Sequence, residues 1–155
     1  MGRATRGVKG MSLAEGDQLI SLEVISSGAT LLSATEKGFG KRSAIEEYPL
    51  HHRGGQGVIT IKTTERNGPV VGVLQVTDED GLMLITSGGK IVRLHAKEIK
   101  VLSRNTQGVR MISLEEGVKV AAISRLAEAE ESNGENSGET SGETEAPATS
   151  EAEPE

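Results

Sequence analysis

The sequence predicts an all-β protein built from repeated, propeller-like units, and three observations lead to this prediction. The chain has 155 residues with 20 Gly but only one Phe and one Tyr, so its core must consist mainly of Val, Ile and Leu, which favour strands. Short apolar runs alternate with glycine-containing turns, and none keeps a 3.6-residue apolar period long enough for a helix. A segment of the chain also repeats at an interval of 51 residues.

The apolar runs predict a series of short strands separated by turn sequences such as Glu15–Asp17, Asn67–Pro69 and Ser87–Gly89. Two segments, Glu46–Tyr48 and Lys97–Ile99, fit a single helical turn each. In chain order, the predicted strands are Val8–Leu13, Gln18–Ile25, Thr30–Ala34, Lys41–Ala44, Val58–Lys62, Val70–Val76, Leu82–Thr86, Ile91–His95, Val109–Leu114 and Val118–Ser124.

The repeat is ungapped over 24 residues. Thr35–Val58 matches Thr86–Val109 with eight identities, including Arg42 with Arg93 and Arg53 with Arg104. The start of the chain resembles the end of the same unit, because Arg3–Val8 resembles Arg104–Val109. We therefore expect the end of one blade at residues 1–25, a blade at about 26–76 and another at about 77–126.

A four-stranded unit of about 50 residues is typical of propellers, which close with about 4–8 blades. Two complete units and a part of a third do not close a ring, so we expect the chain to be the C-terminal piece of a longer array. The alternative is a small β-sandwich in which the internal similarity arose by chance.

Charge divides the chain into two regions. Residues 127–155 hold ten Glu and no Lys, Arg or Asp, whereas residues 1–126 hold 17 basic and 13 acidic residues. The net charge of −6 is therefore the sum of a +4 body and a −10 tail. The polar, single-sign tail is predicted to be disordered, and it either competes with phosphate for the basic body or acts only as a solubilising segment.

Composition excludes several classes of protein. The chain has no Cys, which excludes disulfides, a thiol nucleophile and cysteine-ligated zinc. No apolar run approaches the roughly 18 residues of a membrane span, and the N-terminus lacks the apolar stretch of a signal peptide, so we expect a cytoplasmic protein. His51 and His52 are adjacent and point to opposite faces of an extended chain, which disfavours a metal site.

The arginines at matched repeat positions are the best candidates for a binding function. Matched positions in an array fall on one edge of a ring, so Arg42, Arg93, Arg53 and Arg104 would form a basic stripe along its rim. Such a stripe suits binding to the DNA backbone, because Arg holds phosphate through two parallel donors. The alternative is structural: these arginines pair with the matched Glu47 and Glu98 and brace the blades.

A glycine-rich loop, His52–Gly57, is a weaker candidate. Its glycines would let the backbone approach a phosphate closely, although the same residues also fit an ordinary turn between strands. Tyr48 is the only tyrosine, and its Glu-Glu-Tyr-Pro context favours packing over a nucleophilic role. We find no arrangement of residues that predicts catalysis within this chain.

Four stretches together resemble the last blades of the C-terminal domain of the DNA gyrase A subunit family, over about residues 1–126. These stretches are Glu36–Arg42, Glu46–Pro49, Thr64–Gly68 and Arg104–Val109. The resemblance implies a six-bladed β-pinwheel, in which neighbouring blades exchange strands, with about two and a third blades present here. It also implies wrapping of duplex DNA in support of ATP-dependent negative supercoiling, within an A2B2 complex that contains the rest of the gyrase A protein and the gyrase B protein.

Parts of the family's machinery are not found in this sequence. The catalytic tyrosine belongs to a separate winged-helix region and the ATP site, with its Mg²⁺, belongs to the gyrase B protein, so Tyr48 does not inherit a catalytic role and we expect no cofactor in this chain. The family's diagnostic basic box lies in the first blade, and His51–Gly57 matches only its glycines and one arginine. The corresponding domain of topoisomerase IV is a related alternative, although Thr64–Gly68 favours gyrase.

We therefore expect sequence-independent DNA binding by a non-catalytic, chromosome-associated domain of the cytoplasm, without contact to a membrane. The alternative is that these blades only close the ring and hardly contact DNA. The candidate DNA-binding residues are Arg3, Arg6, Lys37, Lys41, Arg42, Arg53, Lys62, Arg66, Lys90, Arg93, Arg104 and Arg110.

Overall fold

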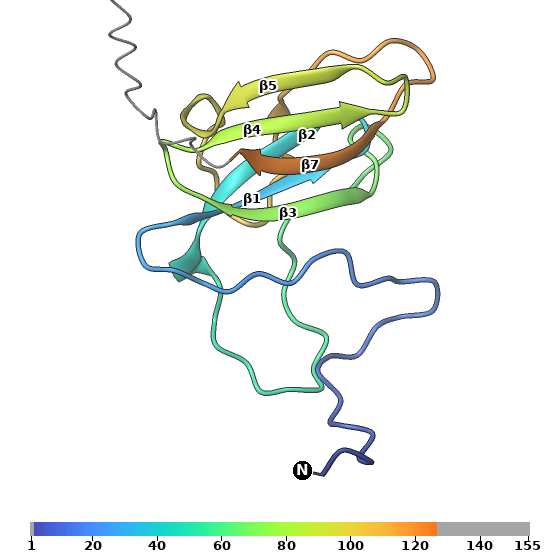
Figure 1. Cartoon of the computed structure of the whole chain (residues 1–155), viewed down its shortest axis with the longest axis vertical. Coiled ribbons are helices and arrows are strands. Elements are labelled where there is room, and N and C mark those ends of the chain that lie inside the picture. The colour runs from blue at the N-terminus through green and yellow to red at the C-terminus, as the bar shows by residue number, and fades with distance from the viewer. Residues whose placement is uncertain (1, 127–155) are drawn as a thin grey trace, which may run out of the picture.

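The computed structural model describes residues 2–126, and these form an all-β fold of two packed sheets (Figure 1). The predicted acidic tail, residues 127–155, lies outside the described residues. The first sheet has the strand order β3-β1-β2-β6 and the second has the order β5-β4-β7. The strands are β1 (Thr30–Thr35), β2 (Phe39–Ala44), β3 (Val70–Val76), β4 (Gly81–Thr86), β5 (Ile91–His95), β6 (Val109–Arg110) and β7 (Val120–Leu126).

The two sheets are built from the same arrangement of strands, and they confirm the repeat. Strand β1 pairs antiparallel with β2 and β3, just as β4 pairs antiparallel with β5 and β7. A register shift lies between Ala34 and Thr35 in β1, and another lies at the matched place between Ile85 and Thr86 in β4. The two predicted turns are short 3₁₀ helices, η1 (Ile45–Glu47) and η2 (Ala96–Glu98).

We call residues 26–76 the first unit and residues 77–126 the second unit. The fourth strand of the first sheet, β6, comes from the second unit and pairs with β2 through Phe39 with Arg110 and Gly40 with Val109. A strand is therefore exchanged between neighbouring units, as the resemblance implied. A second segment of the second unit, around Val101, pairs with the same edge of β2 in parallel orientation. Arg42 N donates to Lys100 O, and Leu102 N donates to Arg42 O.

The hydrophobic core lies between the two sheets and takes residues from both units. Leu32 and Val76 of the first unit and Leu82 of the second unit are fully buried. Ala96 and Ile99 complete the cluster, against which Met111 and Ile123 pack. Because each sheet buries one face against the other, neither unit provides this core alone.

The segment before β1 and the segment between η1 and β3 contain none of the strands predicted there. Residues 8–13, 18–25 and 58–62 have no strand partner within the described part of the chain, and Figure 1 shows both segments running away from the sheets. Many of their large apolar side chains are exposed. They are Val8, Met11, Leu13, Leu19, Ile20, Leu22, Val24, Ile25, Leu50, Val58 and Ile59.

These segments nevertheless contact the units in a repeating manner. Ser12 N donates to Gly55 O at 2.8 Å, and Lys62 N donates to Thr106 O at 2.9 Å. Gly55 and Thr106 are matched positions of the repeat. The N-terminal segment therefore contacts the first unit at Gly55, and the first unit contacts the second unit at the matched residue, Thr106. Within residues 2–126, no helix is long and apolar enough to cross a membrane.

Candidate nucleic-acid interface

Two of the predicted DNA-binding residues, Lys41 and Arg42, are buried at the joint between the units. The Lys41 ammonium, fully buried, donates to the carbonyls of Ser103 and Arg104. Burial lowers the pKa of Lys41, an effect that nearby Glu47 opposes and the Arg104 charge reinforces. Since β2 places these donors against carbonyls of the second unit, Lys41 is not available to a DNA phosphate.

Arg42 is held in the same way and is 5% exposed. Its Nε donates to Ile99 O at 2.9 Å, and its NH1 forms an ion pair with Asp78 at 2.5 Å. Both partners belong to the second unit. The bracing role is therefore observed for Arg42, but its acidic partner is Asp78 and not the expected Glu47.

Arg104 is half-buried at a third contact between the units. Its NH1 donates to Ile59 O at 2.9 Å, and its guanidinium lies 5.7 Å from the centroid of the Tyr48 ring. Glu47 accepts a hydrogen bond from the backbone N–H of Arg104 at 2.9 Å. Tyr48 thus packs against Arg104, as expected. The buried Lys41 and Arg42 are not placed to contact DNA, whereas Arg104, which is only half-buried, stays a predicted contact.

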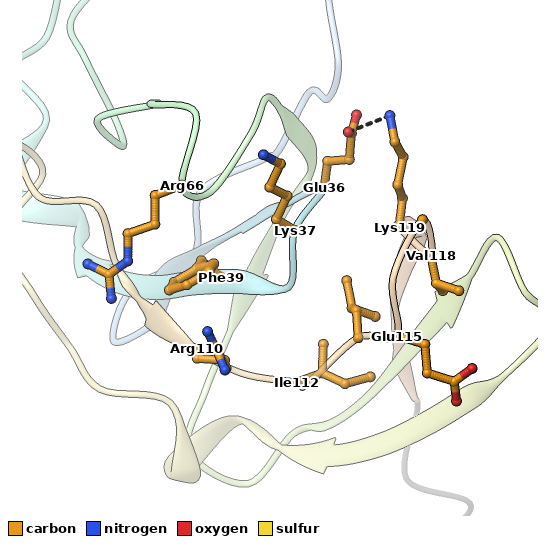
Figure 2. A pocket seen from close by; sticks show the side chains of 11 residues that line it. Glu36, Lys37, Phe39, Arg66, Arg110, Ile112, Glu115, Val118 and Lys119 are labelled. Atoms are coloured by element: carbon orange, nitrogen blue, oxygen red, sulfur yellow. Dashed lines mark ion pairs between the residues drawn. The ribbon is translucent and has the colours of Figure 1, made fainter.

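Three other predicted residues, Lys37, Arg66 and Arg110, lie together at a cavity of about 350 Å³ (Figure 2). The first unit contributes Glu36, Lys37, Phe39 and Arg66 to its lining. The second unit contributes Arg110, Ile112, Leu114, Glu115, Gly117, Val118 and Lys119. The cavity therefore lies across the joint and is lined by basic side chains around an apolar surface.

Phe39 organises the basic end of this cavity. The ring is 4% exposed and contacts two guanidinium groups, with Arg66 Cζ 4.9 Å and Arg110 Cζ 5.4 Å from the ring centroid. Both distances fall within the range of cation–π contacts. Arg66 comes from the loop before β3 and Arg110 comes from β6, so strand exchange is what brings the second arginine to the ring.

The opposite end of the cavity contains an ion pair. Lys119 Nζ lies 2.6 Å from Glu36 Oε1 (Figure 2), and this pair also joins the two units. The Lys37 ammonium donates to the carbonyl of Glu65, which fixes the loop that carries Arg66. The net charge at the cavity is positive, because Glu36 and Glu115 are outnumbered by Lys37, Arg66, Arg110 and Lys119.

The remaining predicted residues are exposed at separate places. Arg3, Arg6 and Arg53 lie on the N-terminal segment and on the loop before β3, whereas Lys90 and Arg93 lie at the turn and strand of β5. Lys62 is exposed, and its backbone joins it to Thr106. None of these six side chains forms an ion pair among residues 2–126.

Two weaker candidates can also be placed. The glycine-rich loop at 52–57 contacts the N-terminal segment through Gly54 N, which donates to Gly10 O at 2.8 Å, and thus acts as a connection between segments. In the described part of the chain, no three His, Asp or Glu side chains are placed to hold a metal ion.

Sequence reasoning missed Phe39 and Lys119 as parts of the site. Phe39 could have been recognised from the sequence, because it is the only phenylalanine and lies close to the basic residues Lys37 and Lys41. Nothing in the sequence pointed to Lys119, since its matched position in the repeat is not basic and its partner Glu36 is more than 80 positions away.

Comparison with known proteins agrees with this architecture. The family model described as the DNA gyrase C-terminal domain, beta-propeller, matches residues 1–26, 29–77 and 81–127. The DNA gyrase A protein of Escherichia coli is 48% identical over 128 residues, which cover 83% of this chain and 15% of that protein. The gyrase A protein of Mycobacterium tuberculosis is 47% identical over 136 residues, which cover 88% of this chain and 16% of that protein.

Solved structures show the same relationship. A DNA gyrase A C-terminal domain superposes with a TM-score of 0.74 at 26% identity, over 82% of this chain and 43% of that one. A C-terminal domain of DNA topoisomerase IV superposes with a TM-score of 0.70 at 25% identity, over 77% of this chain and 38% of that one. The chain thus spans about 15% of the length of the curated relatives it matches.

Proposed function

Because the chain belongs to the DNA gyrase C-terminal domain family, we propose that it binds duplex DNA through the phosphate backbone, without reading base sequence. The observation that carries the proposal is the pair of guanidinium groups of Arg66 and Arg110 over Phe39, at a cavity that Lys37 also lines. Guanidinium groups suit phosphate, because they offer paired donors in a planar arrangement. The other exposed basic residues, among them Arg3, Arg53 and Arg93, add positive charge around this centre.

We further propose that this binding serves the wrapping of DNA during ATP-dependent supercoiling. In this proposal the chain acts with the rest of a gyrase A protein and with the gyrase B protein in an A2B2 complex on the chromosome, in the cytoplasm. The chain itself needs no cofactor, since ATP and Mg²⁺ are used elsewhere in such a complex. A role in topoisomerase IV is the alternative within the same family.

A second candidate function is structural, and the buried joint supports it. Lys41 and Arg42, two of the predicted DNA contacts, hold carbonyls and an acidic side chain of the next unit. In this case the units complete a ring and other blades hold the DNA. The two functions are compatible, because they use different side chains.

A salt titration of DNA binding separates these functions. The full chain is mixed with a fluorescent duplex of about 20 base pairs, and anisotropy is measured between about 50 and 200 mM salt, the range over which phosphate contacts lose affinity strongly. Backbone binding predicts a linear fall of log K with log salt, with a slope of about −0.9 for each phosphate contacted. Absence of binding at about 50 mM salt would favour the structural function.

A further inference from the structure

We propose that the cavity above Phe39 is a phosphate-binding site shared by the two units, so that an occupied site stabilises their joint. The inference deepens the proposed function and rests on it only for the source of the phosphate, which is the backbone of duplex DNA. The chemistry itself, a phosphate held between two guanidinium groups, can be tested without DNA.

The first argument is that the two guanidinium groups are positioned but not used. Arg66 and Arg110 stack on Phe39, yet neither side chain donates a hydrogen bond or forms an ion pair within residues 2–126. The arginines of the joint differ in this respect, because Arg42 and Arg104 donate to carbonyls. Stacking on the ring reduces the freedom of the two cations, so that less entropy is lost when they bind a ligand.

The second argument concerns the shape of the ligand. The two guanidinium groups offer more donors than one carboxylate has oxygens to accept in good geometry. A phosphate group presents more oxygen atoms and more negative charge. The apolar surface of Ile112, Leu114 and Val118 borders the cavity on the side of the second unit.

The third argument is the position of the two arginines. Arg66 belongs to the first unit and Arg110 to the second, and the Glu36–Lys119 ion pair already closes the far end of the cavity. The acidic groups Glu36 and Glu115 lie toward that end (Figure 2), which leaves the Arg66 and Arg110 end for an anion. A phosphate bound there contacts both units and stabilises their joint by mass action.

The test has one arm with free phosphate and one with DNA, both on the full chain. In the first arm, the melting temperature is measured with and without inorganic phosphate, at ionic strength matched with chloride. Phosphate is expected to raise the melting temperature of the wild type and to have no effect on the Arg66→Gln/Arg110→Gln double variant. A Lys97→Gln/Lys100→Gln double variant, which removes the same charge from exposed positions outside the cavity, should respond as the wild type does.

In the second arm, the same proteins are titrated with duplex DNA at several salt concentrations. The cavity variant should show a salt slope less negative by about 0.9, which corresponds to the one phosphate that the two arginines share. Single Arg66→Lys and Arg110→Lys variants keep the charge but lose the planar paired donors, so they should lose the response to phosphate while keeping the fold. If the double variant does not fold, these two single variants test the site in its place.

The outcomes are distinguishable. Loss of the phosphate response together with weaker DNA binding supports the site with DNA as its source, and loss of the phosphate response alone supports the site with a free phosphorylated ligand. Equal responses to phosphate in the wild type and the cavity variants would overturn the inference, even if the chain binds DNA. Failure of the wild type to bind DNA would count against the proposed function, while the first arm would still decide the site.

Discussion

The first and second units share a core of three matched strands with the same register shifts, but equivalent residues lie in different environments. Arg42 is 5% exposed and bonded to Ile99 and Asp78, whereas Arg93, its match 51 residues later, is exposed on β5. The whole of β2 from Phe39 to Ser43 is buried, while β5 is alternately exposed and half-buried. The difference is that β6 and residues 99–102 cover β2, and no segment of the described chain covers β5 in this way.

This comparison shows that a repeat predicts the conformation of a residue better than its role. Conformation depends on the unit itself, which the sequence repeats. Burial depends on the neighbouring unit, and thereby decides whether an arginine holds a carbonyl or faces solvent. Matched substitutions in the two units measure that contribution directly.

The largest difference is expected between Gly108→Ala and Gly57→Ala, a matched pair. Both glycines have a left-handed backbone, with φ of 76° and 77°, which costs a residue with a Cβ about 1–2 kcal/mol. A Cβ at Gly108 would lie only 2.6 Å from Gly40 O, while one at Gly57 meets nothing within 4 Å. We expect overpacking to destabilise Gly108→Ala by about 1–3 kcal/mol more than Gly57→Ala.

Urea unfolding of the full chain, followed by circular dichroism, measures both free energies of unfolding. Gly57→Ala serves as the control for backbone strain. Equal destabilisation by the two substitutions would show that the β2–β6 contact adds nothing to stability.

The second pair is Arg42→Ala and Arg93→Ala. Removing the Arg42 side chain leaves Ile99 O without its donor and Asp78 without its ion pair, and hydrogen bonds to charged groups are worth about 1.5–3 kcal/mol each. Because Asp78 is exposed and recovers water, we expect a loss of about 2 kcal/mol. Arg93→Ala should change stability by no more than about 0.5 kcal/mol, as is usual for exposed residues.

The prediction is checked by comparing the urea unfolding midpoints of the two variants with that of the wild type at one pH and salt concentration. A loss for Arg93→Ala as large as for Arg42→Ala would mean that β5 is covered in solution. That result would identify self-association, and the concentration dependence of the midpoint would confirm it.

The smallest effect concerns pH and Lys41, whose match in the second unit is Val92. Burial lowers the pKa of Lys41 from 10.5 in the folded protein. Between that lowered value and 10.5, the unfolded chain binds more protons than the folded chain, so the free energy of unfolding rises with pH. Relative to a Lys41→Met variant, the wild type should therefore gain stability as pH rises through this window.

The measurement is the difference between the urea midpoints of the wild type and Lys41→Met at a series of pH values up to 10.5. Groups common to both proteins cancel in this difference. A difference that stays constant or falls with pH would show that the ammonium is not buried in the folded state.

Much of the fold could be predicted from the sequence, because the units repeat and their strands are apolar. Strands β3 and β5 have the predicted bounds, and β1, β4 and the two helical turns differ by only a few residues. The strand predicted at Val109–Leu114 is shorter, since only Val109 and Arg110 pair with β2. Residues 8–13 have a similar pattern but no such edge to pair with, and a strand requires a partner as well as a pattern.

The site was predicted less completely, for a different physical reason. Lys37, Arg66 and Arg110 are exposed cations as expected, but their position together depends on the exchanged strand β6. Lys41 looks equally basic in the sequence and is buried, because its ammonium fills a joint whose acceptors lie more than 60 residues away. Charge can be read from single residues, whereas burial at a joint depends on contacts between distant segments.

The exchanged strand also has a consequence in time. Phe39 in β2 pairs with Arg110, about 70 residues later in the chain, and ribosomes add about 5–20 residues per second. During synthesis, the edge of β2 is therefore without its partner for roughly 4–14 s. The first unit can complete its sheet only after most of the second unit has been synthesised. The two units are therefore expected to finish folding together and not one after the other.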